Sequence, residues 1–252
     1  MPYYYGYGYG YGGYGDFLAN NIYCLLLIPI LLLSLWAQMR VSGNFRRYSA
    51  VNNRRRLTGA QAAEAVLRAH GVYDVGIRCV RGSLTDHYDP RDNNIYLSED
   101  VYNAPTVAAV GVACHEAGHA VQYAEGYGPI RLRQAIIPAT QIGSKLSFLL
   151  LMVGMLLYSQ TLFLVGIVLF SFTTLFQLVT LPVEFNASAR ALETIRSEYL
   201  LEGDEVTGAR RVLRAAALTY VAALLMSALQ LLRFVLIFLG RGGNGRRGGG
   251  RE

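Results

Sequence analysis

The stretch LSFLLLMVGMLLYSQTLFLVGIVLFSFTTLFQLVTL occupies residues 146–181 and contains no charged side chain. A helix needs about 20 apolar residues to cross the ~30 Å hydrocarbon core of a bilayer. Only the polar run Tyr158-Ser159-Gln160-Thr161 interrupts this stretch. Residues 146–181 therefore predict a transmembrane hairpin, in which a tight, uncharged turn joins two short spans.

A further apolar block, FLANNIYCLLLIPILLLSLWA, covers residues 17–37. It is long enough to span a membrane, and Pro29 is tolerable within it as a kink. A cleaved signal peptide would need positive charge ahead of its apolar core, whereas Asp16 is the only charged residue there. We therefore expect an uncleaved transmembrane helix.

The last apolar block, residues 215–239, contains Gln230 and Arg233. It either spans the membrane, with Arg233 reaching the interface, or lies partly against the other helices. The expected fold class is therefore a mainly α membrane protein with about four hydrophobic helices.

The composition agrees with this class. The 252 residues are 53% hydrophobic and 16% charged, with a net charge of +6. Soluble domains carry about 25% charge, so disordered proteins, coiled coils and simple cytosolic enzymes do not fit. The three cysteines are too few and too scattered for a disulfide framework.

The arginines predict the topology. No basic residue precedes the first span, whereas Arg40, Arg46 and Arg47 follow it closely, as do the arginines at positions 54–56. By the positive-inside rule, residues 38–145 are expected in the cytoplasm, and the hairpin returns residues 182–214 to the same side. A full crossing by residues 215–239 would place the arginine-rich end outside, against the rule, so the sequence leaves that crossing open.

Both ends of the chain are low in complexity. Residues 1–16 form a Tyr/Gly tail and residues 240–252 an Arg/Gly tail, and both are expected to be disordered. RGG runs occur in RNA-binding segments. With so few repeats, a basic tail near lipid headgroups is the better interpretation, and nucleic acid is not an expected partner.

Residues 38–145 are expected to form an α+β domain. Thr58 caps a predicted helix over residues 58–70. Strand-like runs follow at 75–80, 83–87 and 94–97, with a turn at residues 89–92. The last run contains Ile95-Tyr96-Leu97, which we expect to be an edge strand able to pair with a peptide. A long apolar helix is predicted after Pro105.

This helix contains the pattern H-E-x-x-H, formed by His115, Glu116 and His119. Positions i and i+4 lie on one helix face, so both imidazoles can reach one zinc ion. Glu116 then lies beside the metal, where it can accept a proton from a bound water molecule. The pattern predicts a Zn²⁺ site with Glu116 as the catalytic residue.

A catalytic zinc ion takes three protein ligands. The candidates for the third are Asp86, His87, Cys114 and Glu184. Cys114 points about 100° away from His115 and is expected to pack in the core. Asp86 and His87 fit a turn as well as a ligand. Glu184 is expected at the start of a helix after the hairpin. At that position it could equally bind the metal or interact with the positive end of the helix dipole.

The chain resembles the neutral zinc metallopeptidases of bacterial membranes, the YugP-like family. The matching stretches include LTDHYDPRDNNIYLS, VACHEAGHAVQ, FQLVTLPVEFNASARA and AAALTYVAA, within about residues 17–239. The resemblance implies that His115, His119 and Glu184 bind zinc and that Glu116 is the catalytic base. It places the protein in a bacterial cell membrane.

The layout is also similar to the HtpX-type membrane metalloproteases, in which a membrane hairpin separates H-E-x-x-H from a glutamate ligand. Those proteases have an aspartate four residues after that glutamate, where this chain has Ser188. A serine can hydrogen-bond to a histidine but adds no charge.

The expected function is hydrolysis of peptide bonds by a membrane-anchored metalloendopeptidase, whose zincin-like domain at residues 38–145 carries the active site on the cytoplasmic side. Its partners would be the bilayer and a peptide or protein substrate. Because the site is expected near the membrane, a membrane-associated substrate is favoured. His87, Tyr88 and Arg190 are the candidates to stabilise the oxyanion. There are two alternatives. The protein could be a metal-binding membrane scaffold without catalytic activity, or it could bind RNA or anionic lipid through its Arg/Gly tail.

Overall fold

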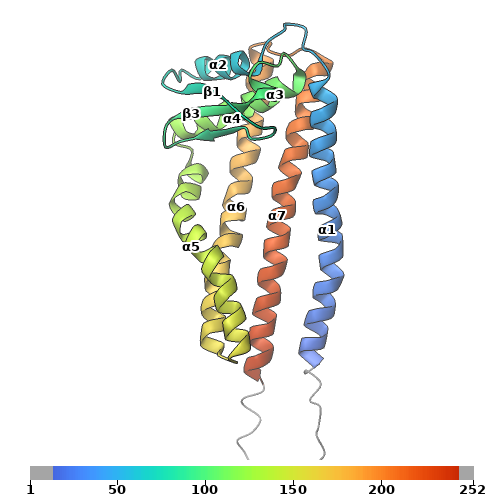
Figure 1. The fold of residues 1–252 in the computed structure, drawn as a ribbon, viewed down its shortest axis with the longest axis vertical. Helices are drawn as coiled ribbons and strands as arrows, with labels where there is room; N and C mark the ends of the chain where they lie inside the picture. The colour runs from blue at the N-terminus through green and yellow to red at the C-terminus, as the bar shows by residue number, and fades with distance from the viewer. Residues whose placement is uncertain (1–13, 244–252) are drawn as a thin grey trace, which may run out of the picture. The chain divides into compact units, whose positions relative to one another are not determined.

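The computed structural model describes residues 14–243. Of the predicted tails at 1–16 and 240–252, residues 1–13 and 244–252 lie outside the described residues. Ten elements follow along the chain (Figure 1): α1 (Tyr14–Ser49), α2 (Gly59–Ala69), β1 (Gly76–Val80), β2 (His87–Asp89), β3 (Asn94–Ser98), α3 (Glu99–Tyr102), α4 (Val107–Ala124), α5 (Gly128–Leu156), α6 (Gln160–Ser197) and α7 (Asp204–Gly243).

Four of these helices are long and apolar enough to cross a membrane. Candidate spans lie within α1, α5, α6 and α7, at Tyr23–Ser49, Gly128–Leu156, Gln160–Ser197 and Asp204–Gly240. The predicted mainly helical class with four hydrophobic helices is confirmed. The predicted hairpin turn is also present, since α5 ends at Leu156 and α6 begins at Gln160.

The helices are longer than the apolar blocks that predict them. α1 begins at Tyr14 and α7 continues to Gly243, so both ends include residues that we expected in tails. Once a helix is nucleated, each added residue gains a hydrogen bond without repeating the cost of nucleation, and the helices extend past their apolar segments.

α6 differs more strongly from the expectation. A break was predicted near residue 182, with Glu184 at the start of a new helix. Instead α6 continues through Pro182 to Ser197. Proline removes one backbone hydrogen bond, which a long helix can accommodate by a kink or a local adjustment. Glu184 therefore lies in the interior of a continuous helix.

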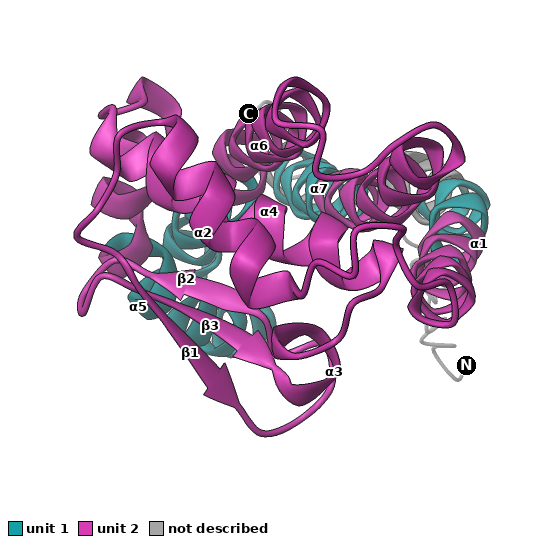
Figure 2. Ribbon diagram, turned by 90° about the horizontal axis from the view of Figure 1, so that it is seen from above, with its two compact units in different colours: residues 1–31, 139–174, 225–252 teal, residues 32–138, 175–224 magenta. Residues whose placement is uncertain are grey.

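The chain divides into two compact units, which Figure 2 shows in different colours. Unit 1 comprises residues 1–31, 139–174 and 225–252, and unit 2 comprises residues 32–138 and 175–224. The long helices α1, α5, α6 and α7 each contribute residues to both units.

Unit 1 contains the helical hairpin, which packs closely through glycines. A Cβ atom on Gly143 would lie 2.9 Å from Leu169 O, and one on Gly154 would lie 2.6 Å from Phe163 N. Small residues let membrane helices approach at backbone distance. These glycines therefore account for the close contact of α5 with α6 in this unit.

Two polar residues of α7 in unit 1 contact α1. Tyr23 Oη donates a hydrogen bond of 2.7 Å to Gln230 Oε1. The Arg233 guanidinium lies 4.2 Å from the centre of the Tyr23 ring. Gln230 and Arg233 therefore both contact α1, on a helix that is also a candidate membrane span.

Unit 2 is built around α4, whose N-terminus is capped by a 3.2 Å hydrogen bond from Ala109 N to Thr106 Oγ1. The helix packs on α2 and on the three-stranded sheet (Figure 2). α2 is the helix predicted after Thr58, and its N-terminus carries a capping box formed by Thr58 and Gln61.

The sheet has the strand order β1-β3-β2, with β1 parallel and β2 antiparallel to β3. The prediction that Ile95-Tyr96-Leu97 forms an edge strand is therefore wrong, because β3 is the central strand. The strand expected at 83–87 is displaced as well. Leu84 has a φ of +57°, Asp86 binds Ser98, and β2 begins only at His87.

Candidate metal centre

The structure brings together His115, His119 and Glu184. One ligand atom from each lies within 4.8 Å of the other two. Nε2 of His115 is 3.3 Å from Glu184 Oε2, and Nε2 of His119 is 3.5 Å from the same oxygen. The imidazole rings meet edge to face, with 4.7 Å between their centres. Two helices build this cluster, since α4 carries both histidines and α6 carries the glutamate.

Each histidine ring is held through its other nitrogen. His115 Nδ1 lies 3.1 Å from Ser188 Oγ, and His119 Nδ1 lies 3.0 Å from Gln122 Oε1. The amide oxygen of Gln122 can only accept, so His119 donates its Nδ1 proton and keeps the lone pair on Nε2. These contacts orient both Nε2 atoms toward Glu184, as is usual for metal-binding histidines.

Glu184 is almost completely buried, and its two carboxylate oxygens differ. Oε1 lies 3.3 Å from Arg133 Nη1. Oε2 is buried and has no hydrogen-bond partner among the described residues. An unsatisfied buried carboxylate oxygen is costly unless a cation or donor compensates it. The donor set of two imidazole nitrogens and one carboxylate oxygen, with this free oxygen between them, fits a zinc ion.

The electrostatics of His119 also favour a cation here. Burial by itself lowers the pKa of His119. The negative charges of Glu184 and Glu116 outweigh burial and raise the pKa above its ordinary value. The surroundings of the His119 ring are therefore arranged to stabilise positive charge.

Glu116 follows His115 directly on α4, and its side chain is largely buried, with a relative exposure of 9%. Its charge acts on His119, so its carboxylate belongs to the same enclosed region. Tyr220, on α7, also neighbours Glu184 and Glu116. The site thus includes an acidic side chain whose charge acts on the His119 imidazole.

The other candidate ligands lie outside this cluster. Asp86 accepts hydrogen bonds from the backbone N–H and hydroxyl of Ser98, and His87 stacks on Tyr96. Cys114 is fully buried, which raises the pKa of its thiol well above the ordinary range, whereas a metal ligand must be a thiolate. Its Sγ faces Ala62 O at 3.9 Å.

All three residues proposed as oxyanion donors from the sequence, Tyr88, Arg190 and His87, contact residues outside the cluster of His115, His119 and Glu184. The Tyr88 hydroxyl donates to Asn93 Oδ1 at 2.7 Å. Arg190 pairs with Glu125 Oε2 at 2.7 Å and donates to Asn186 Oδ1 at 2.8 Å. His87, stacked on Tyr96, has its Nδ1 2.8 Å from Thr85 O.

Sequence reasoning missed Gln122, which links the two helices of the site. Its Nε2 donates to Val183 O at 2.8 Å and to Asn186 Oδ1 at 2.9 Å, while its Oε1 holds His119. An amide three residues after a metal-binding histidine shares its helix face, so the spacing was a usable signal. Arg133, also missed, gives no such local signal.

Close packing of α4 on α6 fixes the distance between the two histidines and Glu184. A Cβ atom on Gly118 would lie 2.8 Å from Ala187 O, a backbone atom that cannot move without shifting α6. On the same helix, a Cβ atom on Gly111 would lie 3.4 Å from the Ala209 side chain, an ordinary contact. The two glycines therefore form a matched pair for substitution.

We expect Gly118→Ala to leave the protein about 1–3 kcal/mol less stable than Gly111→Ala, because only the first overpacks the interface. Both substitutions gain the same helix propensity, so their comparison isolates the steric effect. Denaturant titration in detergent micelles measures both free energies of unfolding. Equal stability of the two variants would contradict a tight α4–α6 contact at Gly118.

Comparison with known proteins gives one family and one curated relative. Residues 23–239 match the sequence model of the family described as "Putative neutral zinc metallopeptidase". The chain is 49% identical over 225 residues to a protein of Bacillus subtilis (strain 168) described as "Putative membrane protease YugP", an alignment that covers 89% of this chain and 98% of that protein. No solved structure matches.

Proposed function

Because this chain belongs to the neutral zinc metallopeptidase family, we propose that it is a membrane-embedded endopeptidase that hydrolyses peptide bonds of protein substrates. His115, His119 and Glu184 would bind Zn²⁺, and Glu116 would be the general base. The observation that carries this proposal is the buried, unpartnered Oε2 of Glu184, which faces Nε2 of both histidines.

The zinc ion, when bound, supplies Lewis acidity to a water molecule and to the scissile carbonyl. Ser188 and Gln122 keep the histidine rings in position through Nδ1. Arg133 holds Oε1 of Glu184, which leaves Oε2 free. All three ligands are thereby fixed before a substrate arrives, so little reorganisation is needed during the reaction.

Glu116 moves the proton in this mechanism. Its carboxylate accepts a proton from the attacking water and delivers it to the nitrogen of the leaving amine. Its low exposure keeps bulk water away from this transfer. Arg133 and Tyr220, rather than His87, Tyr88 or Arg190, are next to Glu184 and are the proposed donors to the carbonyl oxygen.

The proposed substrates are membrane-associated proteins or peptides, and the site is proposed to face the cytoplasm. Glu184 and Arg133 both belong to candidate membrane spans, which supports a substrate that is itself associated with the membrane. The arginines at positions 40–56 and 190–214 support a cytoplasmic, zincin-like domain by the positive-inside rule.

Zinc content of the detergent-purified full chain tests the proposal. We expect about one zinc per chain, and removal by a chelator should abolish hydrolysis of β-casein in the same micelles. Re-addition of zinc should restore both occupancy and activity. A wild-type protein that binds zinc but cleaves neither β-casein nor a membrane-protein substrate would favour the scaffold, and one without zinc affinity would exclude the hydrolase.

A further inference from the structure

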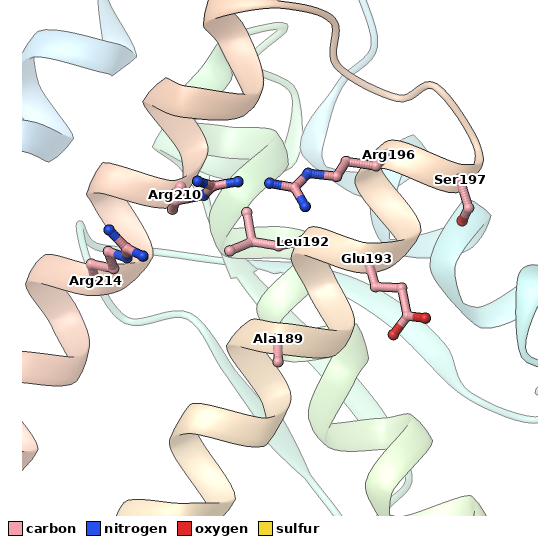
Figure 3. A pocket seen from close by; sticks show the side chains of 7 residues that line it. All are labelled: Ala189, Leu192, Glu193, Arg196, Ser197, Arg210 and Arg214. Atoms are coloured by element: carbon pink, nitrogen blue, oxygen red, sulfur yellow. The ribbon is translucent and has the colours of Figure 1, made fainter.

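A second site lies in unit 2, between the end of α6 and the start of α7. It is a pocket of about 680 Å³. Its lining residues, shown in Figure 3, are Ala189, Leu192, Glu193, Arg196, Ser197, Arg210 and Arg214. None of them belongs to the metal centre.

The pocket gathers positive charge that the described residues do not compensate. Figure 3 shows the guanidinium groups of Arg196 and Arg210 pointing toward one another from α6 and α7, with Arg214 one turn further along α7. The guanidinium groups of the three make no ion pair or hydrogen bond to a residue in 14–243, and the Glu193 carboxylate points away from them. Like charges that face each other are stabilised when an anion lies between them.

Guanidinium groups favour a phosphate as this anion. Each can donate two parallel N–H hydrogen bonds to phosphate oxygens, which a single ammonium group cannot do. Ala189 and Leu192 add an apolar part to the lining. The pocket therefore offers charge for a phosphate and an apolar surface for carbon atoms attached to it.

The position of Arg214 in the sequence points to a lipid as the source of that phosphate. It directly precedes residues 215–232, which contain no charged side chain and lie within a candidate membrane span. A basic residue at such a boundary lies at the depth of phospholipid headgroups. Arg210 continues the same helix face one turn away.

We propose that Arg196, Arg210 and Arg214 form a binding site for the phosphate of an anionic phospholipid headgroup. The site is separate from the metal centre and does not depend on peptidase activity. It is also distinct from the Arg/Gly sequence after residue 240, so a chain lacking residues 244–252 should bind lipid as the full chain does.

The test measures binding of short-chain lipids to the detergent-purified full chain through the midpoint of thermal unfolding. Dihexanoyl phosphatidylglycerol should raise the midpoint, and zwitterionic dihexanoyl phosphatidylcholine should raise it far less. Each arginine near an anionic lipid contributes roughly fivefold in affinity, so Arg196→Gln/Arg210→Gln should bind phosphatidylglycerol about 30-fold more weakly. The single variant Arg214→Gln should weaken binding about fivefold. It tests the same site if the double variant does not fold.

The matched control is Arg91→Gln/Arg211→Gln, which removes two charges outside the pocket. Arg91 pairs with Asp89 and Arg211 contacts the Tyr48 hydroxyl. This control should retain wild-type affinity for phosphatidylglycerol. Equal affinity of the pocket variants and the control would overturn the proposal. Equal stabilisation by inorganic phosphate at the same concentration would also overturn it, because the ligand would then be a soluble anion.

Discussion

Glu116→Gln is expected to reduce hydrolysis of β-casein by about 10³-fold, the central value for loss of a general acid–base group. Glutamine has nearly the shape of glutamate but cannot accept the proton of the attacking water. The substitution leaves His115, His119 and Glu184 in place, so zinc content should stay near that of the wild type. Initial rates and zinc per chain, measured on the same preparation, check both parts.

Glu64→Gln provides the control for this result. Glu64 is an exposed residue of α2 that pairs with Arg68, so its loss of charge should leave the rate unchanged. A Glu116→Gln protein with wild-type activity would exclude Glu116 as the base. Loss of zinc together with activity would instead assign Glu116 to metal binding.

Glu184→Gln is expected to weaken zinc binding by at least about 100-fold, since loss of an outer hydrogen-bond partner alone already costs 10–100-fold. The amide retains a hydrogen-bond acceptor for Arg133 but has no charge to offer at the position of Oε2. Competition with a chromogenic zinc chelator measures the affinity. The fold should persist, because the substitution conserves shape in the buried contact between α4 and α6.

His87→Ala tests whether the third zinc ligand is His87, in β2, instead of Glu184. His87 is exposed and stacks on Tyr96, so its removal should leave zinc affinity unchanged. Wild-type affinity in Glu184→Gln combined with weak binding in His87→Ala would move the third ligand to the β2 region and refute the three-residue site.

The histidine pair could be predicted because it depends on local geometry alone. Thr106 and the apolar run that follows specify a helix, and a helix places residues 115 and 119 on one face. The sequence showed only that Ser188 could hydrogen-bond to a histidine without adding charge, and the structure places its Oγ 3.1 Å from His115 Nδ1. The catalytic and metal-binding roles of these residues remain predictions.

The choice among Asp86, His87, Cys114 and Glu184 could not be made from spacing. It depends on which helix packs against α4, and that contact joins residues far apart in the chain. The same limit explains the error at β3, because strand order is a property of pairing and not of the strand itself. The break expected before Glu184 was wrong for a different reason, because a helix can continue beyond its apolar segment and a long membrane helix can contain a proline.

The division of the site between α4 and α6 has a consequence for biosynthesis. His115 and the serine that orients it are 73 residues apart, and the entire helical hairpin is translated between them. At 5–20 residues per second, the ribosome needs several seconds to add the second half of the site. During that interval the nascent chain carries the H-E-x-x-H helix without its carboxylate partner. The candidate metal site is therefore completed only after the hairpin has been made, and the proposed activity would begin only late in synthesis.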